Sequence, residues 1–575
     1  MGKKQALDLN NEEFQKALQI VQFTRNSLFL TGRAGTGKST FLRYISENVK
    51  KKHVILAPTG IAAINAGGAT LHSFFKIPLH PLLPNDTRYS PRKIRETLKY
   101  NSEKIKLLKE LELIIIDEIS MVRADIVDFI DRVLRIYNRN MREPFGGKQL
   151  LLVGDVYQLE PVLKEDDRQL LSPYYPSGFF FHAKVFQGYN LVSIELKKVY
   201  RQHDPTFISI LDHIRTNNIL DTELERINQQ VNAVAQSPTD QSLSITLSTR
   251  RDTVDYINQQ ELEKLAGEVV TFHGTLKGDF PENTLPTPIE LTIKVGAHVM
   301  FIKNDAEHQW VNGTLGIVSG IDELEGLIYV RNEEGKELQV GQDFWENIVY
   351  TFNTEEQRIE EKVIGSYVQF PLKLAWAITI HKSQGLTFKN VNIDFGSGVF
   401  AAGQTYVALS RCTHLEGIRL QKPIRRKDIF VKPEVVGFAR RYNDGNRIKE
   451  ALSQSKADKE YHDAITAFDK GDFDGFLANF FLAIHSRYDI EKPGVKRFIR
   501  RKLNVINQLK AEVKTLKEEM ESKQDFLKKL STEYVLMGKE CEREGMKTAA
   551  INNYKKALEL YPDNPIAKER LARVK

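Results

Sequence analysis

Residues 28–39 read Leu-Phe-Leu-Thr-Gly-Arg-Ala-Gly-Thr-Gly-Lys-Ser, an apolar run followed by a glycine-rich turn that ends in lysine and serine. Residues 32–39 match the P-loop pattern in full, and apolar residues at helical spacing follow them. A strand, a turn and a helix in this order predict a cradle in which backbone N–H groups and a helix N-terminus face phosphate oxygens. We expect Lys38 to reach the terminal phosphates of a nucleotide and Ser39 to bind Mg²⁺.

Short apolar runs also follow the P-loop, at residues 54–56, 113–116 and 150–153. They are apolar on both faces, as buried parallel strands are, and helical patterns separate them. An α/β fold built from βαβ units on parallel sheets is therefore predicted. A second α/β stretch begins near residue 191, is interrupted by short β-like runs between about 268 and 370, and returns from residue 372.

The composition is that of a soluble, multidomain protein. The chain has 575 residues, 41% hydrophobic and 27% charged, and 82 basic against 75 acidic residues give a net charge of +7. Any contact with a polyanion is therefore local. Two cysteines, Cys412 and Cys541, exclude a disulfide framework and a zinc cluster. The first residues lack the apolar core of a signal peptide, so we expect a cytoplasmic protein, bacterial or phage-related and nucleoid-associated.

Two acidic residues, Asp117 and Glu118, directly follow the apolar run at 113–116. An Asp-Glu pair alone is common on protein surfaces, but this one ends a buried strand downstream of a P-loop. We expect Asp117 to hold Mg²⁺ through water and Glu118 to polarise the attacking water. Together the two motifs predict ATP hydrolysis.

Three segments rich in small and polar residues, 57–63, 70–75 and 374–385, suit the backbone of a nucleic acid. Hydroxyl groups and backbone amides bind phosphates, and a lysine adds charge. His72, Phe74 and Trp310 are candidates for stacking on bases, although a single aromatic residue is more typical of a core. The residues that we expect at a single strand are Thr59, Gly60, Ala62, His72, Ser73, Thr379, His381, Lys382 and Ser383.

A family resemblance is carried by Pro-Phe-Gly-Gly at 144–147, Gly-Asp-Val-Tyr-Gln-Leu-Glu-Pro-Val at 154–162, Val-Tyr-Arg-Gln at 199–202 and Gly-Gln-Thr-Tyr-Val-Ala-Leu-Ser-Arg at 403–411. With the P-loop, they make residues 8–420 resemble the superfamily-one DNA helicases of the PIF (petite integration frequency) family, the 5′-to-3′ group related to RecD. The stretch at 144–147 separates this family from its RecD relatives.

The resemblance implies roles for single residues. Gln15 would read adenine, and Gln158 would sense the γ-phosphate. Arg201 and Arg411 would be arginine fingers that stabilise the charge of the transition state. The implied catalytic residues are Lys38, Glu118, Gln158, Arg201 and Arg411. The implied nucleotide-binding residues are Gln15, Gly32, Gly35, Thr36, Gly37, Lys38, Ser39 and Thr40.

One strand-contact motif departs from the family pattern. The segment 247–258 resembles a motif in which asparagine usually follows the threonine, but Arg250 stands at that position. Thr249 and Asn258 are therefore weaker candidates for DNA contact. Arg250 is either a phosphate contact or a solvated side chain.

The family architecture implies two RecA-like lobes with inserts. Residues 1–190 would form the first lobe, with a wedge-like insert at about 76–93 that carries four prolines. Residues 191–267 and 371–446 would form the second lobe, and residues 268–370 an SH3-like β-barrel inserted into it.

The C-terminal extension, residues 447–575, is almost wholly helical in pattern. Residues 531–562 resemble one tetratricopeptide repeat, and a degenerate copy is expected near 457–490. The extension either docks a protein partner or packs against the motor and stabilises it. Between the repeats a three–four apolar spacing, broken by Lys523, predicts a coiled-coil seam or one long amphipathic helix. The apolar residues are Ile506, Leu509, Val513, Leu516, Met520, Leu527 and Leu530.

The whole pattern predicts an ATP-dependent DNA helicase that moves 5′-to-3′ on single-stranded DNA and unwinds duplex or structured DNA. ATP and Mg²⁺ are the expected cofactors, and single strands and single-strand/duplex junctions the expected partners, bound by a monomer. Family roles in DNA repair, replication and telomere maintenance follow from the resemblance alone. The alternatives are a RecD-like subunit of a larger complex, a translocase that does not unwind on its own, and a scaffold without enzymatic activity.

Overall fold

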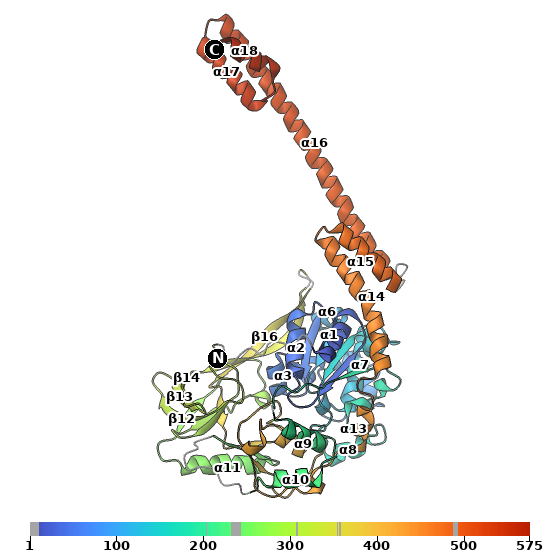
Figure 1. Cartoon of the computed structure of the whole chain (residues 1–575), viewed down its shortest axis with the longest axis vertical. Coiled ribbons are helices and arrows are strands. Elements are labelled where there is room, and N and C mark those ends of the chain that lie inside the picture. The colour runs from blue at the N-terminus through green and yellow to red at the C-terminus, as the bar shows by residue number, and fades with distance from the viewer. Residues whose placement is uncertain are drawn as a thin grey trace. The chain divides into compact units, whose positions relative to one another are not determined.

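The computed structural model describes residues 11–202, 204–231, 243–305, 307, 309–353, 355, 358–486 and 493–574 (Figure 1). The chain divides into two compact units, Met1–His462 and Asp463–Lys575. Within the described ranges, no helix combines the length and the apolar character that crossing a bilayer requires.

The first lobe is a parallel sheet with the strand order β3-β2-β4-β5-β1-β6. The runs that the sequence predicts as buried strands are β1, β2, β4 and β5. The sixth strand, β6, pairs with β1 along its whole length, so the lobe extends to residue 196 and not to 190. The strands are β1 (Leu28–Gly32), β2 (His53–Ala57), β3 (Ala69–Thr70), β4 (Leu113–Ile116), β5 (Gln149–Val153) and β6 (Val192–Leu196).

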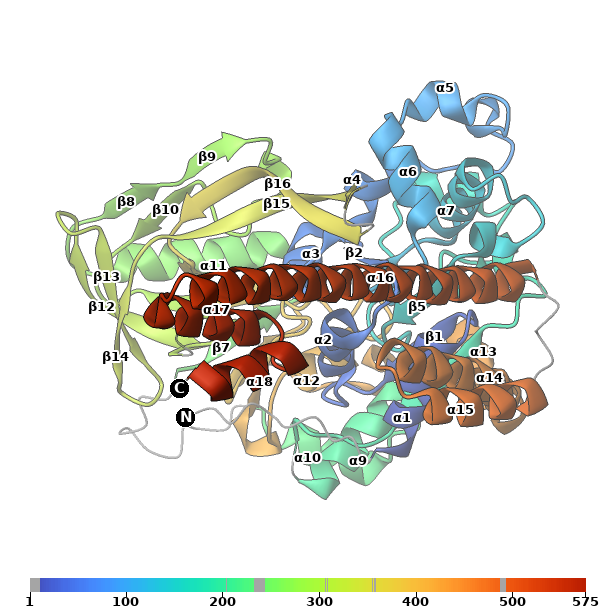
Figure 2. The same cartoon turned by 90° about the horizontal axis from the view of Figure 1, so that it is seen from above.

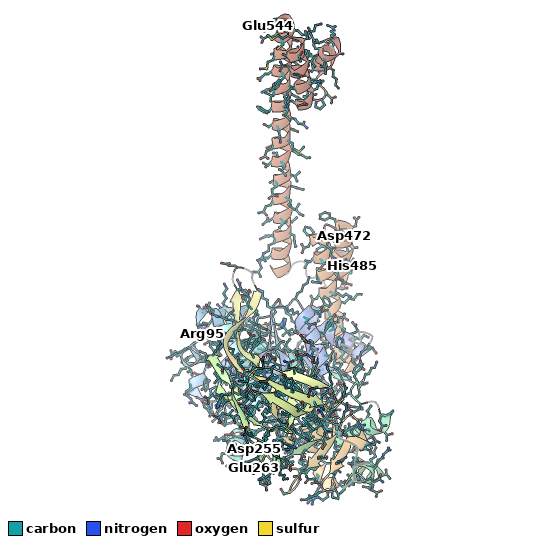
Figure 3. All side chains as sticks on the ribbon, turned by 90° about the vertical axis from the view of Figure 1, so that its left-hand side faces the viewer. Arg95, Asp255, Glu263, Asp472, His485 and Glu544 are labelled. Carbon is teal, nitrogen blue, oxygen red and sulfur yellow. The ribbon has the colours of Figure 1, made fainter. Side chains whose placement is uncertain are left out.

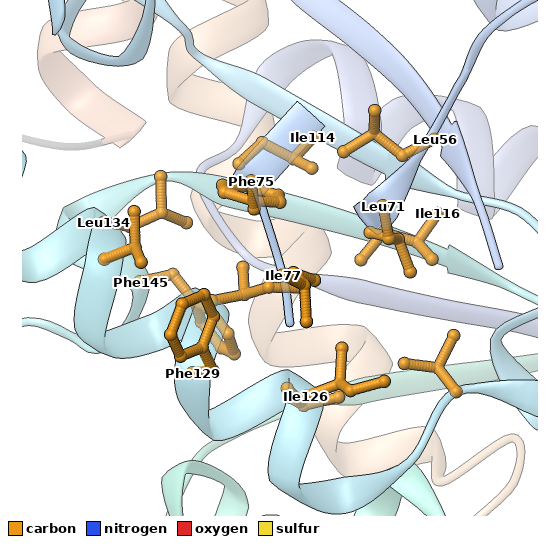
Figure 4. Close-up of a cluster of buried hydrophobic side chains, with 14 of the residues drawn as sticks. Leu56, Leu71, Phe75, Ile77, Ile114, Ile116, Ile126, Phe129, Leu134 and Phe145 are labelled. Atoms are coloured by element: carbon orange, nitrogen blue, oxygen red, sulfur yellow. The ribbon is translucent and has the colours of Figure 1, made fainter. Parts of the chain in front are cut away.

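Helices cover both faces of this sheet and bury two apolar cores. Figure 4 shows part of one core, where side chains of β2, β4, α4 and α7 converge. Phe145 from the 144–147 stretch is buried in it, and its backbone N–H donates to Asp131 Oδ1. The α-helices are α1 (Glu12–Phe23), α2 (Lys38–Asn48), α3 (Gly60–Ala66), α4 (Leu71–Phe75), α5 (Ile94–Leu98), α6 (Ser102–Glu110), α7 (Ala124–Tyr137) and α8 (Glu165–Leu171).

The proline-bearing segment 76–93 is loop-rich, with one 3₁₀ turn, Thr87–Tyr89. Leu82 and Tyr89 anchor it in the core of the first lobe.

The second lobe is a parallel sheet with the strand order β18-β7-β19-β20. Its core receives apolar side chains from α9 and α12. The strands are β7 (Ile245–Ser248), β18 (Ala377–Thr379), β19 (Val391–Asp394) and β20 (Ile418–Leu420), and the helices are α9 (Pro205–Arg215), α10 (Asp221–Asn228), α11 (Arg251–Lys264) and α12 (Gln404–Leu409).

A β-rich insert separates α11 from β18. It contains a five-stranded antiparallel sheet, β14-β13-β12-β11-β17, and two smaller sheets. The insert ends at Leu374 rather than at 370, because β17 pairs with β11 and not with the second lobe. Its strands are β8 (Val270–His273), β9 (Thr275–Gly278), β10 (Glu290–Ile293), β11 (His298–Phe301), β12 (Leu315–Asp322), β13 (Leu327–Asn332), β14 (Glu337–Val340), β15 (Asp343–Asn353), β16 (Arg358–Gln369) and β17 (Leu372–Leu374).

The hairpin of β15 and β16 leaves the insert and reaches the first lobe (Figure 2). Tyr350 and Phe352 of β15 are buried in the core of that lobe. The Tyr350 hydroxyl accepts from the backbone N–H of Ile55 at 3.4 Å.

After the second lobe the chain returns to the first one. Phe438 of α13 (Pro433–Ala439) stacks on Phe181 with ring centroids 4.3 Å apart. Ile448 and Ala451 of α14 (Gly445–Asp469) join the apolar core beneath α1. The segment expected to close the second lobe at 446 therefore packs on the first lobe, and the first unit ends at His462.

The second unit is all-helical. Besides the end of α14, it contains α15 (Phe473–Ser486), α16 (Pro493–Arg543), α17 (Lys547–Leu560) and α18 (Pro565–Val574). The end of α16 packs against α17 and α18 around Tyr554. A Cβ on Gly538 would lie 2.5 Å from the Tyr554 ring, so a small residue is required there. A small residue facing a large one is the packing expected of a helical repeat.

Candidate active site and nucleic-acid interface

The P-loop forms one wall of a cavity of about 560 Å³ between the two lobes. Gly35 has a φ of 80°, and a Cβ there would lie 2.4 Å from Cβ of Arg201, so only glycine fits. Lys38 donates from Nζ to the carbonyl oxygens of Gly32 at 2.7 Å and Arg33 at 3.0 Å. Burial lowers the pKa of Lys38. Its charge is therefore stabilised when phosphate oxygens replace these carbonyls.

Residues from both lobes line this cavity. They include all of Gly35 to Thr40, together with Glu118, Gln158, Tyr200, Arg201, Gly385, Thr387 and Arg411. Asn11 and Phe14, at the start of α1, close one side. Gln15 is exposed on the next helical position and is not among the lining residues, so its expected contact with adenine stays a prediction.

The two acidic residues lie at the carboxyl end of β4. Burial is the main cause that raises the pKa of Asp117. Burial, with Asp117 as the second cause, raises the pKa of Glu118 to about 7. The backbone of Glu118 is left-handed, with a φ of 49°. Such strain in a residue other than glycine is typical of functional sites.

Gln384 of the second lobe completes this group. Its Nε2 donates to Glu118 Oε2 at 2.9 Å and to Gln158 Oε1 at 3.0 Å. Its own Oε1 is buried and has no partner among the described residues. Gln384 lies in the segment 374–385 predicted to face a nucleic acid, but it was assigned no role, because the expected contact residues end at Ser383. Nothing local in the sequence indicates that the side chain turns towards the nucleotide cavity.

Two arginines of the second lobe line the cavity without a carboxylate partner among the described side chains. Arg411 is 1% exposed and donates to the carbonyl oxygens of Val407, Ser383 and Leu386. Burial, with Arg201 nearby, lowers the pKa of Arg411 to about 9. Burial also lowers the pKa of Arg201. Two cations held this way are poised for an anion between the lobes.

Ion pairs close the two lobes on each other. Arg215 of α9 contacts Asp155 at 3.1 Å and Glu195 at 3.0 Å, and both carboxylates belong to the first lobe. Arg33 of the P-loop contacts Asp212 at 2.9 Å. These pairs were not expected from the sequence, because their partners are far apart in the chain.

The two residues expected to hold Mg²⁺ offer the oxygen atoms that this ion prefers. Ser39 lines the cavity, and Asp117 directly follows β4, which β5 separates from the P-loop strand β1. No group of three or more His, Cys, Asp or Glu that could hold a metal occurs in the described part of the chain. Mg²⁺ commonly takes one or two protein oxygens and completes its shell with phosphates and waters.

The strand-contact residues predicted in the first lobe lie on α3, at its N-cap and on α4. Thr59 and Ser73 are exposed, and Gly60, Ala62 and His72 are half-buried. The Thr59 hydroxyl caps α3 by accepting from the N–H of Ala62. Phe74 is 4% exposed and belongs to the core, which favours the structural interpretation of this aromatic residue.

The strand-contact residues predicted in the second lobe differ in their exposure. Lys382 is exposed, and Thr379 and His381 are half-buried. Ser383 is buried, and its hydroxyl donates to the carbonyl of Ile380, so it shapes the turn and does not face a strand. Burial lowers the pKa of His381.

Two weaker candidates have structural roles. Thr249 is 7% exposed, at the end of β7. The Asn258 amide makes two hydrogen bonds to the backbone of Ala377, since Nδ2 donates to its carbonyl and Oδ1 accepts from its N–H. Asn258 therefore holds α11 against β18. Trp310 stacks on Phe301 at 4.5 Å, as a core residue does.

The β-rich insert closes over the interface. A small cavity is lined by α3, by the insert and by Lys382, Gln384 and Leu386 of the second lobe. Asn312 Nδ2 donates to Asn65 Oδ1 at 3.0 Å across it. A Cβ on Gly60 would lie 3.1 Å from Thr284 of the insert. Gln384 thus lines this cavity while it also contacts Glu118 in the nucleotide site.

Comparisons with known proteins agree with this geometry. Residues 9–224 match the family model described as PIF1-like helicase. The chain is 35% identical over 417 residues to the ATP-dependent DNA helicase PIF1 of Homo sapiens, a match that covers 71% of this chain and 60% of the human protein. The chain thus spans less than two thirds of this relative.

Two solved structures are similar over most of the first unit. Bacteroides sp Pif1 in complex with ADP-AlF4 is 41% identical, with a TM-score of 0.69, over 76% of this chain and 97% of that one. Bacteroides Pif1 bound to ssDNA is equally identical, 41%, over 76% and 97%, but its TM-score is 0.55. Motifs, lobe architecture and overall similarity agree, and the chain belongs to the PIF1-like helicase family.

Proposed function

We propose that the chain is an ATP-dependent DNA helicase that moves 5′-to-3′ on single-stranded DNA and unwinds duplex or structured DNA. One observation carries this proposal. A single cavity brings together residues of both lobes. The first lobe supplies the P-loop lysine, a buried carboxylate and a glutamine, and the second lobe supplies two arginines. The names of the relatives support the same activity.

The cavity suits hydrolysis of ATP. Lys38 and the P-loop amides bind the β- and γ-phosphates. Ser39 and Asp117 would hold Mg²⁺, which would neutralise phosphate charge. Glu118, whose pKa of about 7 is that of a base at neutral pH, accepts a proton from the attacking water. Arg201 and Arg411 stabilise the charge that spreads over the γ-phosphoryl group.

Gln384 supports a link between hydrolysis and movement. It contacts Glu118 and Gln158 at the nucleotide and lines the cavity at the strand interface. A change in the nucleotide that shifts Glu118 therefore reaches the turn that carries Lys382. Opening and closing of the lobes would move the strand loops relative to each other.

DNA binding requires the insert to move. The chain has the lower TM-score with the relative bound to ssDNA, and the contact between Asn312 and Asn65 spans the strand-facing surface. We infer that the structure represents the form without DNA, and that a strand displaces the insert from α3. Polarity rests on the family alone.

The helical extension supports a docking role, because the end of α16 and α17 pack together as the predicted repeat would, with α18 on the same core. A RecD-like subunit is less favoured, since the 144–147 stretch is present and its Phe145 is buried.

Strand separation on two partial duplexes, one with a 5′ tail and one with a 3′ tail, tests the function. We expect ATP-dependent unwinding of the 5′-tailed substrate only, and its loss in Lys38→Ala. Lys50→Ala, which changes an exposed lysine near the end of α2, is the matched control and should unwind normally. Hydrolysis stimulated by DNA without unwinding would instead indicate a translocase or a subunit. Unwinding of the 3′-tailed substrate would overturn the polarity.

A further inference from the structure

The middle of α16 has no neighbouring helix among the described residues of the second unit. The helix has 51 residues, and every residue from 507 to 526 is exposed. Figure 3 shows its side chains with no other helix of the second unit beside them. Contacts with other helices occur at its ends, where Lys502 meets Asp469 and Val535 packs against α17. A solvated helix of this kind gains little stability from its own hydrogen bonds, so a partner surface is expected.

One face of this segment is apolar at a strict heptad spacing. Ile506, Val513, Met520 and Leu527 occupy the first core position of successive heptads, and Leu509, Leu516 and Leu530 the second. Leu509 is 55% exposed, Leu516 58% and Met520 64%. A seven-residue repeat, rather than a 3.6-residue one, is typical of helices that wind around another helix.

The residue types indicate how many helices pair. β-Branched Ile506 and Val513 at the first core position, with Leu509 and Leu516 at the second, favour two parallel strands. Lys523 interrupts the second position once. A single polar residue in such a seam lowers stability and fixes the register and the number of strands.

The charges beside the seam favour a second copy in parallel. Glu512 and Glu519 lie on one side of the apolar face, and Lys510 and Lys517 on the other. In a parallel pair, Glu512 faces the partner's Lys517 across the seam. In an antiparallel pair, glutamates face glutamates and lysines face lysines, which is repulsive.

We propose that α16 is the interface of a parallel homodimer, in which two copies of this chain pair along residues 506–530. The pairing covers the apolar face of both helices and places the N-terminal ends of the two copies of α16 at the same end of the coil. This differs from the single copy that the sequence analysis expected on DNA. The inference does not depend on helicase activity, because it rests on α16 alone.

The mass of the full-length chain in solution, measured by sedimentation over a concentration series, tests the proposal. We expect reversible formation of a particle with twice the 65.9 kDa of one chain.

Val513→Glu with Leu516→Glu should give a single chain with unchanged ATP hydrolysis and circular dichroism. Thr515→Glu with Ser522→Glu adds the same charge on the outer face and should remain dimeric. A single chain throughout, as when α16 packs on its own motor, would overturn the proposal. A dimer that survives the seam variant would also overturn it.

A charge exchange tests the register. Glu512→Lys and Lys517→Glu should each weaken self-association at least tenfold, because each places like charges across the seam. A mixture of the two variants restores both opposite-charge contacts and should pair as a heterodimer. If the mixture does not pair more tightly than either variant alone, the parallel arrangement is wrong.

Cross-linking tests the direction. With Cys541→Ser as background, Leu509→Cys should form a disulfide between two copies under mild oxidation, since equivalent core positions meet only in a parallel pair. Thr515→Cys, on the outer face, is the control and should not. Absence of the Leu509→Cys product in a particle of two chains would exclude the proposed direction.

Discussion

At the scale of single residues, the surroundings of Glu118 favour its neutral form, whereas its proposed role requires the charged form. Its carboxyl group is buried beside Asp117 and its backbone is strained, yet the proposed reaction requires its charged form. The pKa of about 7 is the compromise, and it lies near the value that suits a general base.

The rate of hydrolysis at saturating ATP should therefore rise with pH through about 7, because only deprotonated Glu118 accepts a proton. Glu118→Gln should keep nucleotide binding and lose roughly 10²–10⁴-fold of the rate. Steady-state ATP hydrolysis with single-stranded DNA, on both sides of that pH, measures this. A flat profile together with an active Glu118→Gln protein would place the base elsewhere.

The raised pKa of Glu118 also predicts how the stability of the folded chain depends on pH. The folded-state pKa of Glu118 lies above its ordinary value of 4.5, so this group stabilises the fold below pH 4.5 and the contribution is lost as pH rises to about 7. The melting temperature of Glu118→Gln should therefore exceed that of the parent chain above pH 7. Thermal melts of both proteins over a pH series measure the difference, and an unchanged difference across the series would contradict the assignment.

Gln384 should couple the two sites. Gln384→Ala removes two hydrogen bonds, one of them to a carboxylate, and should lower DNA-stimulated hydrolysis roughly ten- to a hundredfold. Hydrolysis without DNA should change less. Thr387→Ala, at an exposed residue that lines the nucleotide cavity and makes neither of these hydrogen bonds, is the control. If hydrolysis falls equally with and without DNA, Gln384 only orients Glu118 and does not couple the two sites.

The positions of site residues that directly follow a strand were predicted from the sequence. The P-loop and the Asp117–Glu118 pair follow strands, and their spacing alone indicates where they lie. Gln384, Arg215 and Asn258 depend on contacts between distant segments, and a polar side chain does not show which side it faces. Ser383 and Gln384 are adjacent, yet one is buried in its own turn and the other joins two sites.

At the scale of elements, the insert is the part expected to move. Its hairpin is anchored in the first lobe by Tyr350. Its contact at α3 combines the polar pair Asn65 and Asn312 with Ile64, which packs against the edge of an apolar cluster of the insert. A contact with few buried apolar side chains opens at lower cost than a core does.

Joining α3 to the insert should block DNA binding. Asn65→Cys and Asn312→Cys, in a Cys541→Ser background and linked by a short bifunctional maleimide, would hold the contact closed. We expect loss of single-strand binding in a fluorescence assay and retained nucleotide binding. The unlinked double variant is the control and should bind DNA. A linked protein that binds DNA normally would exclude the expected movement.

At the scale of the whole molecule, side-chain packing sets the boundary between the two units. The sequence pattern places it at residue 447, where the chain becomes wholly helical. The structure places it after residue 462, because Ile448 and Ala451 belong to the core of the first lobe and Gln19 donates to Ser455. Helical periodicity alone does not show which core a helix joins.

Truncation separates these two boundaries. A chain that ends after residue 462 should keep its ATPase activity and melting temperature. One that ends after residue 446 exposes the core beneath α1 and should lose about 2–5 kcal/mol of unfolding free energy. Denaturant unfolding monitored by fluorescence measures the difference, and equal stability of the two chains would contradict the packing of α14.

α14 belongs to both units, with its first turns packed on α1 and its last turns in the helical extension. Anything attached to the extension is therefore linked by a continuous helix to the lobe that carries the P-loop. No such helix joins the extension to the second lobe in the described part of the chain. Under the proposed function, a partner held by the extension therefore stays with the first lobe, and the second lobe moves relative to both.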